Sequence, residues 1–176
     1  VDAQHYARFL LGWHGVLKPR FGSDRLLDAI VQLEGVAIPF SELDRILASR
    51  IADYRPAMLD ELGASGAIVW VGKGALSVND GRIALYRRER VHLLLDRAPP
   101  DAALDEPHRR VLAHLETKGA SFFAELHHAS GLASTKETAE VLTDLVYAGL
   151  ITNDMFQPLR ARERASSKRA TASGRM

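Results

Sequence analysis

Apolar residues recur at helical spacing through the first 66 residues of the chain. A helix is predicted from Gln4 to about Trp13, and the Gly- and Pro-containing stretch after it indicates a linker, so that residues 1–22 form an N-terminal helix and linker. Three further helices are predicted to begin at Ser23, after Pro39 and at Pro56, the last ending at Gly66. Their apolar stripes are Leu26, Leu27, Ile30 and Leu33; Leu43, Ile46 and Leu47; and Met58, Leu59 and Leu62.

After Gly66 the period of the pattern changes from about 3.6 to 2. Residues 67–71 and 82–86 predict two paired strands, and Asn79-Asp80-Gly81 between them is a tight-turn signal. Three helices followed by a hairpin are the outline of a winged helix. Residues 89–95 fit either a short strand or a short helix.

A second set of helices is predicted over 107–118, 121–130 and 134–148, after a linker at 97–106. Residues 150–152 look like the start of a strand, although no second long hairpin follows. A constant offset of 83 relates Phe40 to Phe123 and Gly66 to Gly149. Any two three-helix units would share some leucines at such spacings by chance. The matching aromatic and glycine positions favour an internal repeat instead. We therefore predict a mainly α fold with small β-hairpins (α+β), built of tandem winged-helix domains: 23–96, a second winged-helix-like domain at 107–160, and a basic tail at 161–176.

Composition excludes several classes of function. The chain of 176 residues contains no cysteine, which excludes disulfides, cysteine-ligated zinc, thiol catalysis and iron–sulfur chemistry. No apolar run approaches the roughly 20 residues that cross a bilayer, and the start has no signal-peptide form, so we expect a soluble, cytoplasmic chain. The seven histidines have no metal-ligand spacing, and no phosphate-binding loop or G-x-S-x-G motif is present. We expect no metal, no cofactor site and no catalytic residue in this chain.

The formal net charge of +1 hides an uneven distribution. Residues 160–176 hold six Lys or Arg and one Glu, a net charge of +5, which leaves −4 on the other 159 residues. Nucleic-acid binding is the class of function that such a winged helix favours. The third helix of each unit, however, is predicted to expose acids that oppose phosphate: Asp60 and Glu61 in the first, and Glu137, Glu140 and Asp144 in the second.

The hairpin carries more suitable residues. We call Lys73, Asn79, Arg82, Arg87, Arg88 and Arg90 the wing cluster and predict that it contacts phosphates, although charges that protect a strand edge are equally ordinary. Lys136 at a helix start and Trp13, which has the chemistry to stack on a base, are further candidates. Packing is the competing interpretation for Trp13, and Trp70, within a β run, is predicted to be core.

Three stretches of the chain resemble the C-terminal region of bacterial large helicase-related proteins, the Lhr family. They are residues 8–16 (RFLLGWHGV); residues 33–35, 54–62 (YRPAMLDEL), 69–76 (VWVGKGAL) and 79–85 (NDGRIAL); and residues 119–123 with 144–160 (DLVYAGLITNDMFQPLR). Their order and spacing cover most of residues 8–160. The C-terminal extension of that family is similar to AlkZ-type tandem winged-helix DNA glycosylases.

The resemblance implies a fragment of a superfamily 2, ATP-dependent 3′-to-5′ DNA helicase that works in DNA repair. ATP and Mg²⁺ would belong to motor domains outside this chain, and the partners would be DNA, those motor domains and further copies of the chain, at the bacterial nucleoid. The Gln-x-Gln motif of the AlkZ type is absent, because Gln4, Gln32 and Gln157 lie far apart. Two alternatives to a DNA-binding module stay open: a protein-interaction (oligomerisation) module, and a glycosylase that excises a damaged base.

Overall fold

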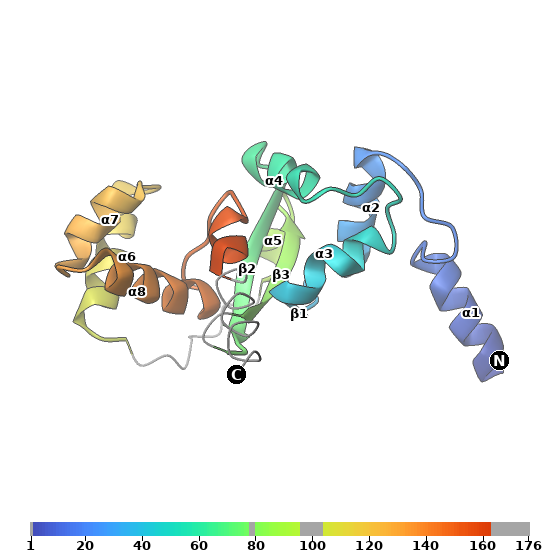
Figure 1. The fold of residues 1–176 in the computed structure, drawn as a ribbon, viewed down its shortest axis with the longest axis horizontal. Coiled ribbons are helices and arrows are strands. Elements are labelled where there is room, and N and C mark those ends of the chain that lie inside the picture. The colour runs from blue at the N-terminus through green and yellow to red at the C-terminus, as the bar shows by residue number, and fades with distance from the viewer. Residues whose placement is uncertain (1, 78–79, 96–103, 163–176) are drawn as a thin grey trace, which may run out of the picture.

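The computed structural model describes residues 2–77, 80–95 and 104–162. The helix α1, Ala3–Trp13, stands at one end of the molecule, and α6 and α7 lie at the other, with a small sheet between them (Figure 1). Asn79, residues 97–103 of the linker predicted at 97–106, and residues 163–176 of the tail predicted at 161–176 lie outside the described residues, so the predictions made for them stay predictions.

The first unit is a winged helix. Its helices are α2 (Ser23–Leu33), α3 (Phe40–Ala48) and α4 (Pro56–Ala64), and its strands are β1 (Ile38–Pro39), β2 (Ile68–Ala75) and β3 (Gly81–Arg87). The sheet is antiparallel in the order β1-β3-β2, with Trp70 opposite Leu85 and Ile38 opposite Ile83. The predicted hairpin is therefore confirmed, and β1 adds a third strand that the sequence did not indicate.

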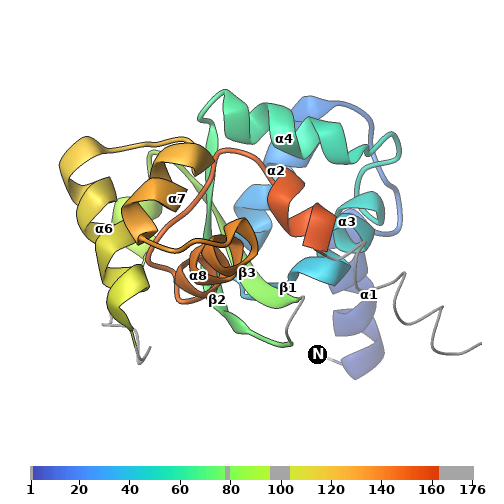
Figure 2. The same cartoon turned by 60° about the vertical axis from the view of Figure 1, so that its left-hand side comes forward.

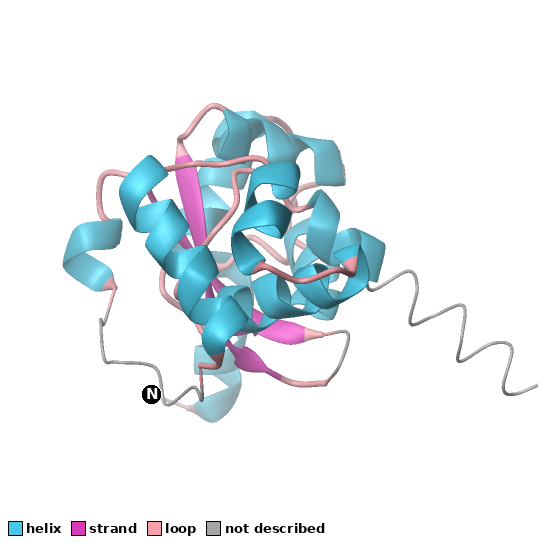
Figure 3. Cartoon of the chain, turned by 90° about the vertical axis from the view of Figure 1, so that its left-hand side faces the viewer, coloured by secondary structure: helices cyan, strands magenta, loops and turns pink. Residues whose placement is uncertain are grey.

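The core of this unit lies between the helices and one face of the sheet. Trp70 is 2% exposed and packs with the stripes of α2, α3 and α4, which confirms its predicted place in the core. The other face of the sheet buries Val71, Ala84 and Tyr86 against the short helix α5, Val91–Leu94. A helix is thus the form that residues 91–94 adopt. Helices flank the strands on both sides (Figure 3).

The second unit consists of α6 (Glu106–Lys118), α7 (Phe123–Ser130) and α8 (Thr135–Tyr147). Its own apolar core is formed by Val111, Leu126, Val141 and Leu145. As predicted, Ser134 caps α8, its side chain accepting a hydrogen bond from the amide of Glu137. The predicted strand at 150–152 is wrong: these residues are not in a strand, and the Thr152 hydroxyl donates to the carbonyl of Trp70 at 2.5 Å. The chain turns back onto the first unit there instead of starting a hairpin.

Two glycines let α8 lie directly on the sheet. A Cβ atom at Gly72 would overlap the carbonyl oxygen of Val146, and one at Gly81 would overlap the ring of Tyr147. Figure 2 shows α8 against β2 and β3 at this contact. The wing is therefore covered on one face by the second unit.

Candidate nucleic-acid interface

The cations of the wing cluster fall into two groups. Arg87, with a side chain 24% exposed, lies 3.5 Å from Glu34 and 3.2 Å from Glu89, and its amide donates to Glu34 at 2.9 Å. Arg90 lies 3.6 Å from the same Glu34, whose side chain is only 6% exposed. These two arginines neutralise a buried carboxylate that joins α2 to the end of β3, so they are part of the fold.

The other wing cations are more available. Arg82 is exposed and Lys73 is half-buried, and neither has a carboxylate within 4.0 Å in the described chain. Arg88 is exposed and donates through Nε to the carbonyl of Gly66 at 2.8 Å, which fixes its position at the opposite end of β3 from Arg82. Five strand residues span about 17 Å, so the structure does not bring Arg82 together with Arg87 and Arg90.

The third helix of the winged helix, α4, is partly covered. Residues 152–160, which we call the clasp, return across α3 and α4, as the red segment in Figure 2 shows. Asp60 accepts hydrogen bonds from the amide of Phe156 at 3.0 Å and from the guanidinium of Arg160. The prediction that Asp60 is a free exposed acid is therefore wrong, since its carboxylate is neutralised by a residue 100 positions away. Glu61 is exposed, as predicted.

Arg160 and Phe156 anchor the clasp. Arg160 is 9% exposed, lies 3.7 Å from Asp44 in addition to its bond with Asp60, and has its guanidinium carbon 5.8 Å from the centroid of the Phe156 ring. The Phe156 ring is fully buried between Phe40 and Trp70, with centroids 6.4 and 5.6 Å away. Sequence reasoning counted Arg160 among the cations of a basic tail and missed its role.

Tyr54 completes the polar end of the clasp. Its hydroxyl donates to Asp44, the second carboxylate that Arg160 faces. Burial, and next the hydrogen bond to Asp44, raise the pKa of the Tyr54 hydroxyl. The phenol therefore stays protonated and holds Asp44 in place for Arg160.

In the second unit, Lys136 is exposed and lies 3.8 Å from Glu140 on the next turn of α8, an ordinary surface pair. His108 lies between Asp105 and Asp144, and its hydrogen bond to Asp105 lowers the pKa of that carboxyl. No group of three or more His, Asp or Glu residues in the described ranges is placed to hold a metal ion. None of the described helices is long and apolar enough to span a bilayer.

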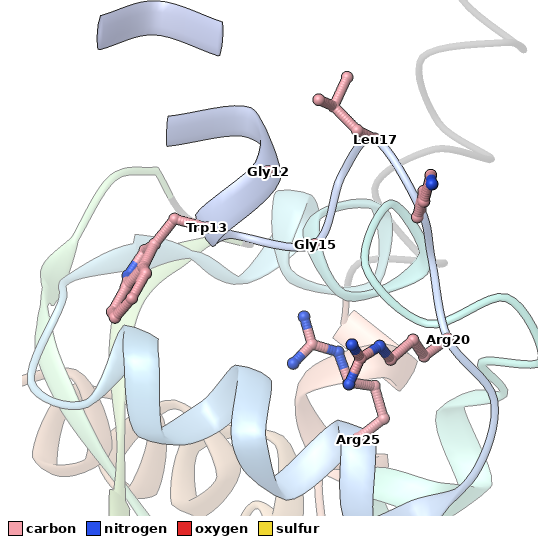
Figure 4. Close-up of a pocket in the computed structure, with 7 residues that line it drawn as sticks. Gly12, Trp13, Gly15, Leu17, Arg20 and Arg25 are labelled. Carbon is pink, nitrogen blue, oxygen red and sulfur yellow. The ribbon is translucent and has the colours of Figure 1, made fainter. Parts of the chain in front are cut away.

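Trp13 lies outside the core, 61% exposed and stacked on Phe9 at 5.9 Å. It borders a pocket of about 440 Å³ between α1 and α2 that is also lined by Gly12, Gly15, Leu17, Lys18, Arg20 and Arg25 (Figure 4). We call this the basic pocket. No sequence motif indicates this pocket, because its three cations are spread over a linker and the first turn of a helix.

Comparison with known proteins places this architecture in a family. The family model of the large helicase-related protein, winged-helix domain, matches residues 1–88, which run from α1 through β3. The chain belongs to the Lhr family. It is 38% identical over 165 residues to a Mycolicibacterium smegmatis protein named "Lhr helicase/ probable uracil glycosylase", a match that covers 92% of this chain. It is 32% identical over 200 residues to an Escherichia coli protein named "Lhr helicase/uracil glycosylase", with 99% of the chain covered.

The chain spans only 11% and 13% of the length of these two Lhr relatives. Each match is thus to one segment of a much longer relative. The family model includes α1 and the linker after it, so the basic pocket lies wholly within the matched Lhr segment. The clasp and the second unit extend beyond that segment.

Proposed function

We propose that this chain is a DNA-binding and assembly module of an Lhr-type helicase that acts in DNA repair. ATP and Mg²⁺ would be used by motor domains outside the chain. The observation that carries the proposal is a winged helix of the Lhr family whose wing presents Arg82 and Lys73 without carboxylate partners among the described residues. A wing with free cations is suited to contact with the DNA backbone.

The packing of the wing supports this proposal. Arg87 and Arg90 hold the base of the hairpin to Glu34, and α8 supports its covered face through Gly72 and Gly81. The wing is thus fixed in position before DNA arrives, which limits the ordering that binding costs. Backbone contact of this kind supplies affinity with little sequence preference.

A DNA titration tests the proposal. Fluorescence anisotropy of labelled single- and double-stranded oligonucleotides at two salt concentrations gives the affinity and its salt dependence. The variant Lys73→Ala/Arg82→Ala is expected to reduce the salt slope by about 0.7 per lost contact on single strands and about 0.9 on duplex. The matched control, Arg109→Ala/Lys118→Ala, removes two exposed cations from α6 and is expected to bind as the unaltered chain does. A chain that binds neither DNA form at low salt contradicts the proposal.

The apolar face of α1 favours assembly as a second role. No residue of α1 is buried, and Tyr6 and Phe9 are 56% and 58% exposed. An aromatic stripe of this kind marks a contact with another part of the Lhr protein or with a second copy. Sedimentation distinguishes these two contacts. Salt-insensitive self-association that is lost in Tyr6→Ser/Phe9→Ser indicates contact with a second copy. A monomer at both salt concentrations contradicts contact with a second copy.

The names of the two relatives raise uracil excision as a third possibility. A glycosylase needs a pocket for the flipped base and an acid or base directed at the sugar. The described lining of the basic pocket carries cations and apolar groups, with no carboxylate. We therefore propose binding without excision, and incubation of the chain with uracil-containing DNA tests this: abasic sites formed by the chain alone would contradict it.

A further inference from the structure

Three cations converge at the junction between α1 and the winged helix. Lys18, Arg20 and Arg25 line the basic pocket, and Figure 4 shows the guanidinium groups of Arg20 and Arg25 side by side below the loop at Gly15. Arg20 and Lys18 are exposed, whereas the side chain of Arg25 is only 12% exposed. The pocket thus combines a buried cation at its base with exposed cations at its mouth.

Carboxylates do not balance this charge. Within the described chain, the ion-pair partner of Arg25 is Asp28, at 3.6 Å and with a side chain 67% exposed, and neither Lys18 nor Arg20 has a carboxylate within 4.0 Å. The Nε atom of Arg25 is buried and has no hydrogen-bond acceptor among the described residues. An anion in the pocket would supply the negative charge that a single, exposed carboxylate does not.

A fourth arginine adds to the positive field. The amide of Arg20 donates to the carbonyl of Arg50 at 3.4 Å, and the amide of Ala52 donates to the carbonyl of Arg20 at 2.9 Å, which joins the two segments. The Nε atom of Arg50 is also buried, with no acceptor in the part of the chain that the structure describes. Burial, and next the charge of Arg25, lower the pKa of the Arg50 guanidinium. Arg50 does not line the pocket, since its guanidinium donates to the carbonyl of Ile46 at 3.0 Å, but its charge acts on Arg25 and adds to the positive field behind it.

The loop over the pocket is fixed by the chain itself. Gly15 has φ of 72°, a left-handed conformation that favours glycine, and the absence of a Cβ atom lets the guanidinium of Arg25 pack directly against the loop. Gln32 donates to the carbonyl of Trp13 at 2.9 Å, and the amide of Gly22 donates to Asp53 at 3.1 Å. Both ends of the loop are thus tied to the winged helix, so the cations are held in place and not left on a free strand.

The chemistry of the lining selects the ligand. Paired guanidinium groups bind phosphate oxygens through parallel N–H donors, and the exposed indole of Trp13 at the same pocket offers a face on which a base stacks. We propose that the basic pocket binds a phosphodiester of a DNA strand through Lys18, Arg20 and Arg25, with Trp13 stacking on an adjacent base. This inference rests on the proposed function for DNA as the partner, and adds a contact distinct from the wing.

The test compares the chain with Lys18→Ala/Arg20→Ala, which removes the two exposed cations and leaves Arg25 in its packed place. Anisotropy with a labelled single-stranded oligonucleotide is expected to show about tenfold weaker binding at low salt and a salt slope smaller by about 1.4, for two lost contacts. Arg109→Ala/Lys118→Ala is again the matched control. Trp13→Ala is expected to weaken binding without changing the salt slope, because stacking releases no counterions.

Binding of inorganic phosphate, followed by calorimetry, separates the two sources of a phosphate group. Unchanged DNA affinity in Lys18→Ala/Arg20→Ala, together with phosphate binding that this variant abolishes, overturns the strand assignment and leaves a site for a free phosphate. No effect on either ligand overturns the inference entirely. If the unaltered chain binds no DNA, both the proposed function and the strand assignment are wrong. The phosphate titration then shows separately whether the pocket binds an anion.

Discussion

The clasp makes the strongest prediction about stability. The variant Phe156→Ala removes a fully buried ring that packs between Phe40 and Trp70 and joins residues 152–160 to the core of the winged helix. Truncation of a buried Phe to Ala costs about 3–5 kcal/mol, because the transfer free energy of the ring is lost and a cavity is left. Folded domains of ordinary stability have about 5–15 kcal/mol in total. The variant is therefore expected to lose a large share of the free energy of unfolding.

Urea denaturation followed by circular dichroism measures this loss directly. In a thermal melt followed by the same signal, the melting temperature of a chain of this size is expected to fall by about 10 °C, since each kcal/mol lost lowers it by about 2–4 °C. The fluorescence of Trp70, which is 2% exposed, gives a local reading, since loss of the ring beside it opens the indole to water. Phe122→Ala is the matched control, because Phe122 is 84% exposed and its removal is expected to change stability by less than about 0.5 kcal/mol. A loss below about 1 kcal/mol in Phe156→Ala would refute the reasoning, since the clasp would then not be packed as described.

Two further predictions concern the contact of α8 with the wing and the cap of α6. Gly72→Ala is expected to cost about 1–3 kcal/mol or more in urea denaturation, because its Cβ meets the backbone of Val146, whereas Gly12→Ala, whose Cβ has a nearest neighbour at 4.0 Å, is expected to be neutral or stabilising. For Asp105, whose folded pKa is lowered by its hydrogen bond with His108, the stabilisation is present above the unfolded pKa of about 3.9 and is lost as the pH falls through the folded value. Asp105→Asn is therefore expected to flatten the acid limb of the stability curve, and an NMR titration of this carboxyl that shows no downward shift contradicts the assignment.

The winged helix was largely predictable, because its signals are local. The change from helical to alternating spacing at Gly66, and the turn signal before Gly81, predicted the two paired strands that the structure shows. Trp70 was correctly assigned to the core because it lies within a continuous apolar, β-forming run. The short pairing of Ile38 with Ile83 was not predictable, because two residues carry no period.

The polar contacts were not predictable, because they join distant segments. Arg160 and Asp60 are 100 positions apart, and Glu34 and Arg87 are 53 positions apart. No pattern within a short stretch of sequence relates such partners, so each charged residue was expected to lie alone on the surface. The prediction of a strand at residues 150–152 was wrong for a related reason. Their β-forming side chains suit a strand, but their position is set by the hydrogen bond of Thr152 to Trp70.

These long-range contacts change which surface of the Lhr module is suited to DNA. The clasp neutralises Asp60 and covers one side of α4, and α8 covers one face of the wing. Among the cations that have no carboxylate partner in the described chain, two pairs are placed to share a strand: Arg82 with Lys73 on the wing, and Lys18 with Arg20 at the basic pocket. Because each place would release its own counterions, combining the two double variants is expected to reduce the salt slope additively if one strand contacts both. A combined slope no smaller than that of either double variant alone would mean that the two places do not hold DNA together.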